Sequence, residues 1–110
     1  MAPQTISISY TASEKANIRG VTYVRMGKLV EINLYFDIIE QISNNGHIID
    51  FMTELPKPTG LYSTGVARSV NGGIALVSIE RAHNNCITSW GATPVGTYYY
   101  AKLLYITSDE

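Results

Sequence analysis

The feature that most constrains this fold is a regular alternation of apolar and polar residues over positions 30–38. The apolar residues occupy every second position: Val30, Ile32, Leu34, Phe36 and Ile38. The residues between them are polar or amphipathic: Glu31, Asn33, Tyr35 and Asp37. Because successive side chains of a strand point to opposite faces, this pattern predicts a long β-strand with one buried face.

Shorter apolar segments predict further strands at residues 6–10, 21–24, 62–70, 74–81, 86–90 and 97–106, and leave residues 48–55 ambiguous. Between these segments lie a polar loop at 11–16, tight turns at Gly27 and Gly72, and Pro56 and Pro58, which cannot donate ladder hydrogen bonds. Gly65 predicts a bulge within 62–70. With no amphipathic helix pattern, the chain is expected to be all-β, an antiparallel β-sandwich or jelly roll of about eight strands.

Composition and charge restrict the class of protein. The 110 residues are 45% hydrophobic and 15% charged, which suits one folded domain, residues 1–110, with loose ends at 1–4 and 108–110. The formal charge of −1 offers no basic face for nucleic acid. Apolar runs are too interrupted for membrane insertion, and no signal-peptide pattern is present. The single cysteine, Cys86, cannot form an internal disulfide, so we expect synthesis in a reducing cytoplasm.

Sequence motifs for catalysis are absent, and we expect no enzyme. There is no Gly-x-Ser-x-Gly elbow, His-Glu-x-x-His helix or Walker loop. A Ser–His–Asp set from His47, Asp50 and a serine is one of many arbitrary combinations, and no pair of carboxylates is singled out for glycoside hydrolysis.

Metal-ligating residues occur only as two short spacings. His47 with Asp50 and His83 with Cys86 could each hold an ion between two ligands, but zinc sites gather three or four. We therefore expect both histidines in surface turns, with no metal and no cofactor.

Sugar binding has a better basis in the residues. A pyranose offers an apolar C–H face for an aromatic ring and hydroxyls for planar polar groups. The only tryptophan follows a polar turn, so the candidate saccharide-binding residues are Trp90, Arg81, His83, Asn84, Asn85 and Tyr62. If 74–81 and 86–90 form a hairpin, Trp90 lies about 13 Å along the strand from that turn. A shared pocket would then need a neighbouring loop or subunit, and core or inter-subunit packing of Trp90 is the alternative.

Three consecutive tyrosines open the last predicted strand. Tyr98 and Tyr100 would share one face, while Tyr99 would lie on the other with Ala101 and Leu103. At least one tyrosine therefore faces a surface, a second sheet or a subunit interface.

Four segments, taken in order, resemble the C-terminal head domains of phage tail fibres and receptor-binding proteins. They are the Gly-Lys hairpin at 21–32, the Leu-Pro-Lys-Pro elbow within 54–58, the Gly-turn strand at 71–79, and the Tyr-rich closing strand from 96–101 to 105–107. The resemblance implies a trimeric head at the tip of a virion tail. It also implies production in a bacterial host and non-enzymatic binding of a host surface saccharide or cell-wall polymer.

Three other functions remain open at this stage. The domain could be a capsid or baseplate assembly module without glycan binding, a polysaccharide depolymerase with two facing carboxylates, or a lectin-like domain of a cellular organism.

Overall fold

The computed structural model describes residues 4–6 and 8–109, which form nine strands and, within these ranges, no helix. The strands are β1 (Gln4–Ile6), β2 (Tyr10–Ala12), β3 (Ala16–Met26), β4 (Leu29–Ile38), β5 (Gly46–Phe51), β6 (Tyr62–Arg68), β7 (Ile74–Glu80), β8 (Cys86–Trp90) and β9 (Gly96–Ile106). All nine pair antiparallel in the order β1-β3-β4-β9-β6-β7-β8-β5-β2. The predicted all-β antiparallel class is confirmed.

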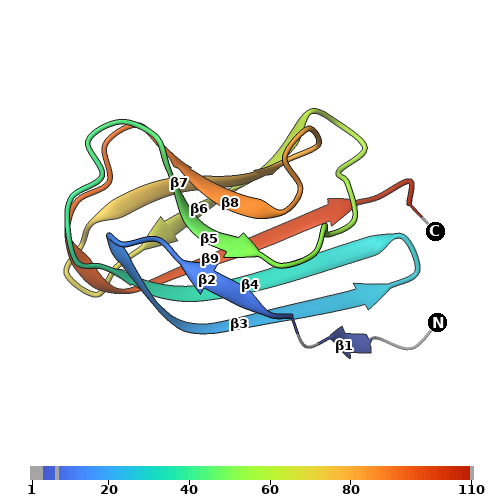
Figure 1. Ribbon diagram of the computed structural model, residues 1–110, viewed down its shortest axis with the longest axis horizontal. Helices are drawn as coiled ribbons and strands as arrows, with labels where there is room; N and C mark the ends of the chain where they lie inside the picture. The colour runs from blue at the N-terminus through green and yellow to red at the C-terminus, as the bar shows by residue number, and fades with distance from the viewer. Residues whose placement is uncertain (1–3, 7, 110) are drawn as a thin grey trace.

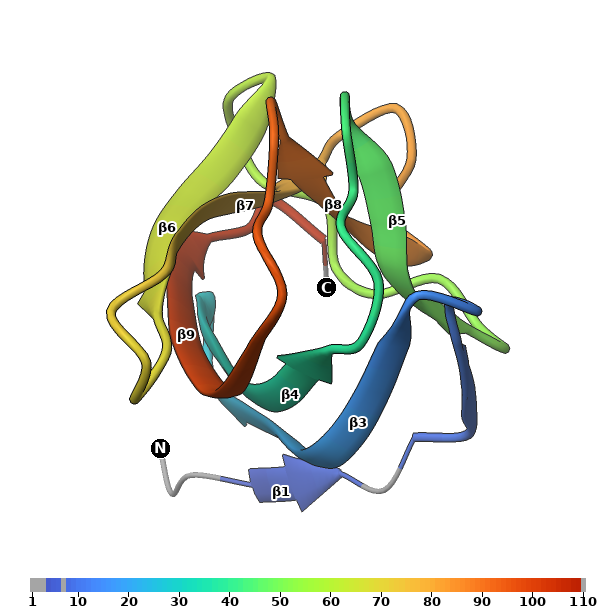
Figure 2. The same cartoon turned by 90° about the vertical axis from the view of Figure 1, so that its left-hand side faces the viewer.

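The strands make one sheet that curls back on itself. The end-on view shows β3, β4, β9, β6, β7, β8 and β5 arranged around a common interior (Figure 2). β2 pairs with β5 and approaches β3, so the two ends of the sheet nearly meet. The interior is therefore enclosed by one nearly closed, barrel-like sheet, rather than lying between two separate sheets as in a strict sandwich.

The three longest strands lie side by side, and the central one, β4, pairs with β3 on one side and β9 on the other (Figure 1). Its predicted apolar face is confirmed, since all five residues are 0–1% exposed: Val30, Ile32, Leu34, Phe36 and Ile38. The predicted reversal is also confirmed, because Met26 pairs with Leu29 across a two-residue turn in which Gly27 has φ of 62°. This left-handed conformation favours glycine.

The closing strand contributes aromatic residues to the same interior. Tyr99 is fully buried and stacks on Phe36 with ring centroids 5.1 Å apart, and its hydroxyl donates to the Pro94 carbonyl at 2.8 Å. Tyr98 and Tyr100 are exposed on the opposite face, as the strand periodicity predicts. The buried phenol of Tyr99 thus contributes apolar area to the core while its hydroxyl is hydrogen-bonded.

Three local predictions are wrong. Residues 6–10 are not one strand, because Ile6 ends β1 and Tyr10 begins β2, with Ser7 outside the described residues. Residues 11–16 are not all loop, because β2 pairs with β5 and Ala16 already belongs to β3. Gly65 marks no bulge, since β6 and β7 pair without a register shift. A Cβ at Gly65 would instead lie 2.6 Å from the Lys102 carbonyl oxygen, so glycine permits close approach of β6 and β9.

The chain ends differ from the expectation of loose termini where they are described. Gln4 pairs with Arg25, and the Asp109 carboxylate accepts a 2.8 Å hydrogen bond from the Lys57 backbone N–H. Residues 1–3 and 110 lie outside the described residues.

Residues 4–6 and 8–109 include no helix of the length and apolarity that a membrane crossing requires.

Candidate functional site

The outer surface of the sheet carries a shallow groove over β6, β7 and β8. It has a volume of about 280 Å³ and is lined by Tyr62, Thr64, Leu76 and Trp90. The predicted hairpin of β7 and β8 is confirmed and pairs Leu76 with Trp90, while Tyr62 and Thr64 come from the neighbouring strand. Two of the predicted sugar-binding residues, Tyr62 and Trp90, are thereby brought together.

The Trp90 ring is fixed in this groove. Its indole Nε1 donates a hydrogen bond to the Ser78 hydroxyl on the adjacent strand, and Ser78 is 1% exposed. The exposed fraction is 36% for the residue Trp90 and 60% for the residue Tyr62. Because its polar edge is held by a neighbour, Trp90 presents an oriented aromatic surface to the solvent.

The other four predicted residues lie elsewhere, around the β7–β8 turn. Arg81 donates from Nη1 to the Pro58 carbonyl at 2.9 Å, and Asn85 accepts at its carbonyl from the Phe51 N–H at 2.7 Å. His83 is exposed on the same turn. Asn85 thus bonds to the last residue of β5 and Arg81 to the segment that follows it, so these two groups hold that part of the chain rather than line the Trp90 groove.

Asn84 is the most enclosed of the four. It is 4% exposed, its amide donates to the Leu55 carbonyl, and its own carbonyl accepts from the Leu55 N–H at 2.9 Å. The predicted polar turn and Trp90 therefore do not share a pocket within one chain.

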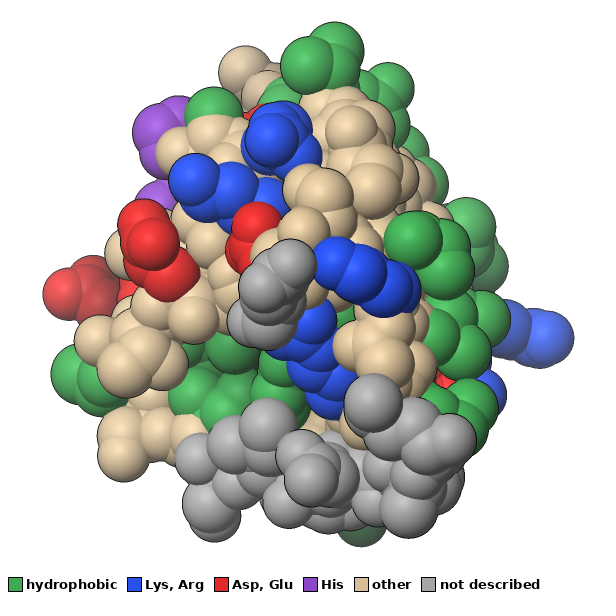
Figure 3. Space-filling view, turned by 90° about the vertical axis from the view of Figure 1, so that its right-hand side faces the viewer, with side chains coloured by type: hydrophobic (Ala, Val, Ile, Leu, Met, Phe, Trp, Pro, Cys, Tyr) green, Lys and Arg blue, Asp and Glu red, His purple; other side chains and the backbone are tan. Residues whose placement is uncertain are grey.

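A second hollow, of about 470 Å³, lies where Asn84 meets the end of the sheet that carries the β3–β4 hairpin. Its charged lining residues are Arg25, Glu54, Lys57 and Asp109. Figure 3 views this end, where Lys and Arg side chains lie close to Asp and Glu. Arg25 donates from Nε to the Gly27 carbonyl at 2.8 Å and from Nη2 to the Asp109 carbonyl, so its guanidinium is already engaged within the chain. Equal numbers of opposite charges give this hollow no preference for a ligand of either sign.

The most strongly perturbed carboxyl group, Asp37, lies on the outer face of β4 between two bulges. One register shift in β3 displaces Arg19, and one in β9 leaves Thr97 and Tyr98 opposite Asp37. Tyr98 has a φ of 52°, a left-handed conformation that is uncommon for a non-glycine residue. Both neighbouring strands thus deviate from regular pairing at the position of this one side chain.

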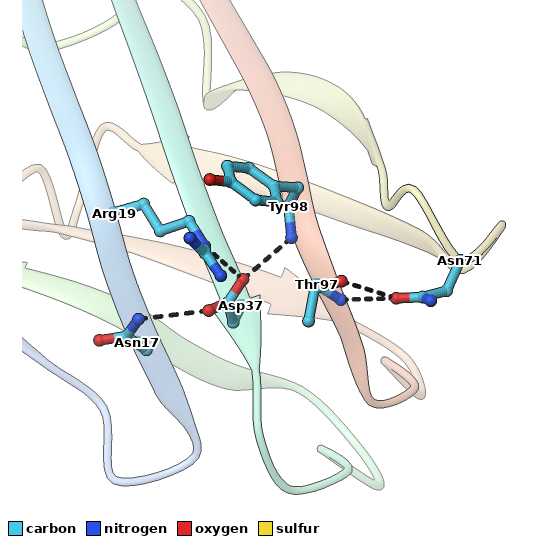
Figure 4. Close-up of polar contacts among 6 residues, drawn as sticks. All are labelled: Asn17, Arg19, Asp37, Asn71, Thr97 and Tyr98. Atoms are coloured by element: carbon cyan, nitrogen blue, oxygen red, sulfur yellow. Dashed lines mark hydrogen bonds and ion pairs between the residues drawn. The ribbon is translucent and has the colours of Figure 1, made fainter.

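The Asp37 carboxylate accepts three hydrogen bonds (Figure 4). The donors are Arg19 Nε at 2.8 Å, the Tyr98 N–H at 2.9 Å and Asn17 Nδ2 at 3.2 Å. The Arg19 guanidinium, with the other two donors, lowers the pKa of Asp37 from 3.8 to about 2, although burial opposes the shift. Arg19 also lies 3.8 Å from the centroid of the Tyr98 ring. With its oxygens satisfied, Asp37 fixes the two bulges and is not poised for proton transfer.

One grouping was missed from the sequence, and the prediction of both histidines in turns is wrong for His47, which lies in β5 and pairs with Thr88. The spacing paired His47 with Asp50 and His83 with Cys86, whereas the structure places ligand atoms of His47, Asp50 and Cys86 within 4.8 Å of one another. The available signal was the adjacent pair Ile48–Ile49, since two neighbouring apolar residues within an otherwise alternating strand are typical of a bulge.

Apolar side chains also gather beyond the groove, over β9, β6, β7 and β8, which are consecutive in the sheet. We call this surface the outer apolar face; its residues are 36–64% exposed and comprise Tyr62, Val66, Ile74, Leu76, Trp90, Leu104 and Ile106. Exposed apolar side chains gathered on neighbouring strands are typical of binding or assembly sites.

Comparison with known proteins adds no relative: no family model, curated protein or solved structure matches this chain.

Proposed function

We propose that this chain is the non-enzymatic carbohydrate-binding head of a phage or prophage tail receptor-binding protein, and that the Tyr62–Trp90 groove takes the sugar. The observation that carries the proposal is the Trp90 ring, which is oriented by Ser78, partly exposed and flanked by a second aromatic residue. The resemblance of the hairpin, elbow and closing strand to tail-fibre heads supplies the biological setting.

The chemistry of the groove favours a neutral saccharide. Trp90 and Tyr62 offer aromatic faces for the C–H face of a pyranose, and the hydroxyls of Thr64 and Tyr62 can hydrogen-bond its rim. Among residues 4–6 and 8–109, no charged side chain lines the groove, so an anionic wall polymer would find no compensating cation among them. Shallow stacking sites of this kind give affinities near the millimolar range, about 4 kcal/mol per site.

Several copies acting together would convert this weak binding into adhesion. We propose a homotrimer at the tip of the virion tail, in which the β9 part of the outer apolar face, with Leu104 and Ile106, lies between copies. These two residues are 54% and 52% exposed. Trp90 lies on β8, three strands from β9 in the sheet, whereas Tyr62 and Thr64 lie on β6 next to β9, so contact through β9 would leave the Trp90 side of the groove open to the host surface.

The test is a glycan array of bacterial surface saccharides, probed with the biotinylated full chain held as four copies on streptavidin. We expect retention on neutral saccharides, and at least tenfold weaker retention for Trp90→Ala and Tyr62→Ala. Tyr10→Ala removes a comparably exposed aromatic residue from β2 and is the matched control. Absence of retention, or equal loss in all three variants, contradicts the proposed site.

The exposure of Leu104 and Ile106 equally favours a second function, a structural module of the virion or baseplate that only assembles. In that case Leu104→Asp would abolish self-association measured by light scattering, while the wild type would bind neither array nor host cells. Receptor binding predicts both self-association and cell retention, so the two functions differ in the second measurement.

A further inference from the structure

A bulge in β5 determines where two polar side chains of this strand point. His47 pairs with Thr88 and Asp50 with Cys86, but Ile49 pairs with Ile87, so Ile48 is the extra residue of this strand. Ile48 and Ile49 are both fully buried. In a regular strand, positions three apart face opposite sides. Because the bulge uses two consecutive residues on the inner face, His47 and Asp50 both point outward.

The neighbouring strand brings a thiol to the same place. Cys86 is paired directly with Asp50, and its Sγ lies 3.7 Å from His47 Nε2. On the other side of the imidazole, Nδ1 donates to the Asp50 carboxylate at 2.9 Å. Figure 1 shows β5 and β8 running side by side. The carboxylate, imidazole and thiol form a compact cluster across two strands, with one ligand atom of each lying within 4.8 Å of the others.

We propose that Cys86 Sγ and His47 Nε2 bind a zinc-class divalent transition-metal ion, with Asp50 orienting the imidazole through Nδ1. Zn–S and Zn–N bonds of about 2.3 and 2.1 Å at a tetrahedral angle place sulfur and nitrogen about 3.6 Å apart. The observed separation of 3.7 Å, which a thiol–imidazole hydrogen bond also spans, is close to that value. A carboxylate behind a ligating histidine is the usual support of such a ligand.

Charge and access agree with this assignment. A thiolate at Cys86 and the Asp50 carboxylate together would neutralise a divalent cation, and Glu80 adds negative potential nearby. The side chains of His47 and Asp50 are 57% and 41% exposed, so an ion can enter from solvent. Two protein ligands are fewer than the three or four of a closed zinc site, so water or a ligand from outside would take the two remaining coordination positions.

A nucleophilic role for the same thiol is less well supported. Burial raises the pKa of Cys86, and Asp50 and Glu80 raise it further, which disfavours the reactive thiolate in the absence of a metal. Cys86 is also only 3% exposed, which restricts access by a substrate carbonyl.

The experiment is a titration of the reduced full chain with Co²⁺, followed by its displacement with Zn²⁺. We expect one Co²⁺ per chain and a near-ultraviolet sulfur-to-cobalt charge-transfer band that Zn²⁺ abolishes. His47→Gln and Cys86→Ser should both remove the band, and Asp50→Ala should weaken binding 10–100-fold. His83→Gln is the matched control, because His83 is the other histidine and is not part of the cluster; it should bind like the wild type.

Two outcomes would overturn the inference. One is the absence of the charge-transfer band at saturating Co²⁺. The other is unchanged affinity in His47→Gln, which would mean that the ion is held by unrelated surface groups. His47 is half-exposed, so this variant keeps the test decisive even where Cys86→Ser perturbs folding.

Discussion

The long strands β3, β4 and β9 and the short strands β5, β6, β7 and β8 use their outer faces differently. On the long strands, outward groups are paired with one another: Asp37 with Arg19, Glu31 with Lys102, and Tyr35 stacked on Tyr100 at 4.7 Å. The short strands instead leave an aromatic groove and a thiol–imidazole pair open to ligands. The binding chemistry therefore lies on the outer face of the short strands, while both groups of strands contribute fully buried residues to the core, such as Phe36 on β4 and Ile49 on β5.

The sharpest way to break this comparison is to remove a core side chain from the long strands. Phe36→Ala deletes a fully buried ring that stacks on Tyr99, and should lower the free energy of unfolding by about 3–5 kcal/mol. Tyr35→Ala, the adjacent outward position, should cost about 1 kcal/mol through its lost stacking on Tyr100. Because both residues lie on β4, urea unfolding of the two variants compares the inner face of this strand with its outer face, and equal costs would contradict a stability carried by the inner face.

Acid titration sharpens the role of the paired charges. The pKa of Asp37 is about 2 in the folded chain, below its ordinary value of 3.8, so its stabilisation is complete above about pH 4 and is lost as the pH falls towards 2. The loss should approach about 2 kcal/mol. Unfolding followed by urea from pH 5 to pH 2 should show this slope in the wild type and a flatter one in Asp37→Asn and Arg19→Gln. The same slope in all three would contradict the role of the cluster.

Variation of the groove should separate binding from stability. Trp90→Ala removes a half-buried ring and its bond to Ser78, at a cost of about 1 kcal/mol, because solvent can replace the hydrogen-bond partner. Glycan retention should nevertheless fall at least tenfold. Thermal unfolding and array retention, measured on the same sample, check the split; a large loss of stability would make Trp90 a structural residue.

The smallest effect is expected at the exposed ion pair of the long strands. Lys102 Nζ lies 3.3 Å from the Glu31 carboxylate with both side chains partly solvated, so Glu31→Gln should leave the urea midpoint unchanged within error. A clear decrease would mean that outward pairs on these strands contribute more than their solvation suggests.

Much of the fold follows from local patterns. The alternation at 30–38 fixes which face of β4 is buried, and the Tyr98–Tyr100 periodicity fixes the orientation of β9. The closure of one sheet does not follow from such patterns, because it depends on the pairing of β9 with β6 and β5 with β8 across long stretches of chain. Pairing of this kind is decided by tertiary packing rather than by the residues of one strand.

The site was predicted only in part for a similar reason. Tyr62 and Trp90 meet because β6, β7 and β8 are neighbours in the sheet, whereas Asn84 is used to hold Leu55. The grouping of His47 with Cys86 depends on the pairing of β5 with β8, and Asp50 joins them only through a one-residue bulge, which reverses the faces of all residues beyond it. Spacing along the chain gives no information on that reversal unless the bulge is identified first.

The central claim is that Trp90 stacks on a saccharide, and its own fluorescence tests this most directly because it is the only tryptophan. The measurement is indole emission and acrylamide quenching during titration with the glycans that the tetramerised chain retains on the array. The account predicts a shift in emission and protection from the quencher, both saturating with retention and both absent for a non-retained glycan. No retained glycan, or retention with unchanged Trp90 emission and quenching, would contradict it.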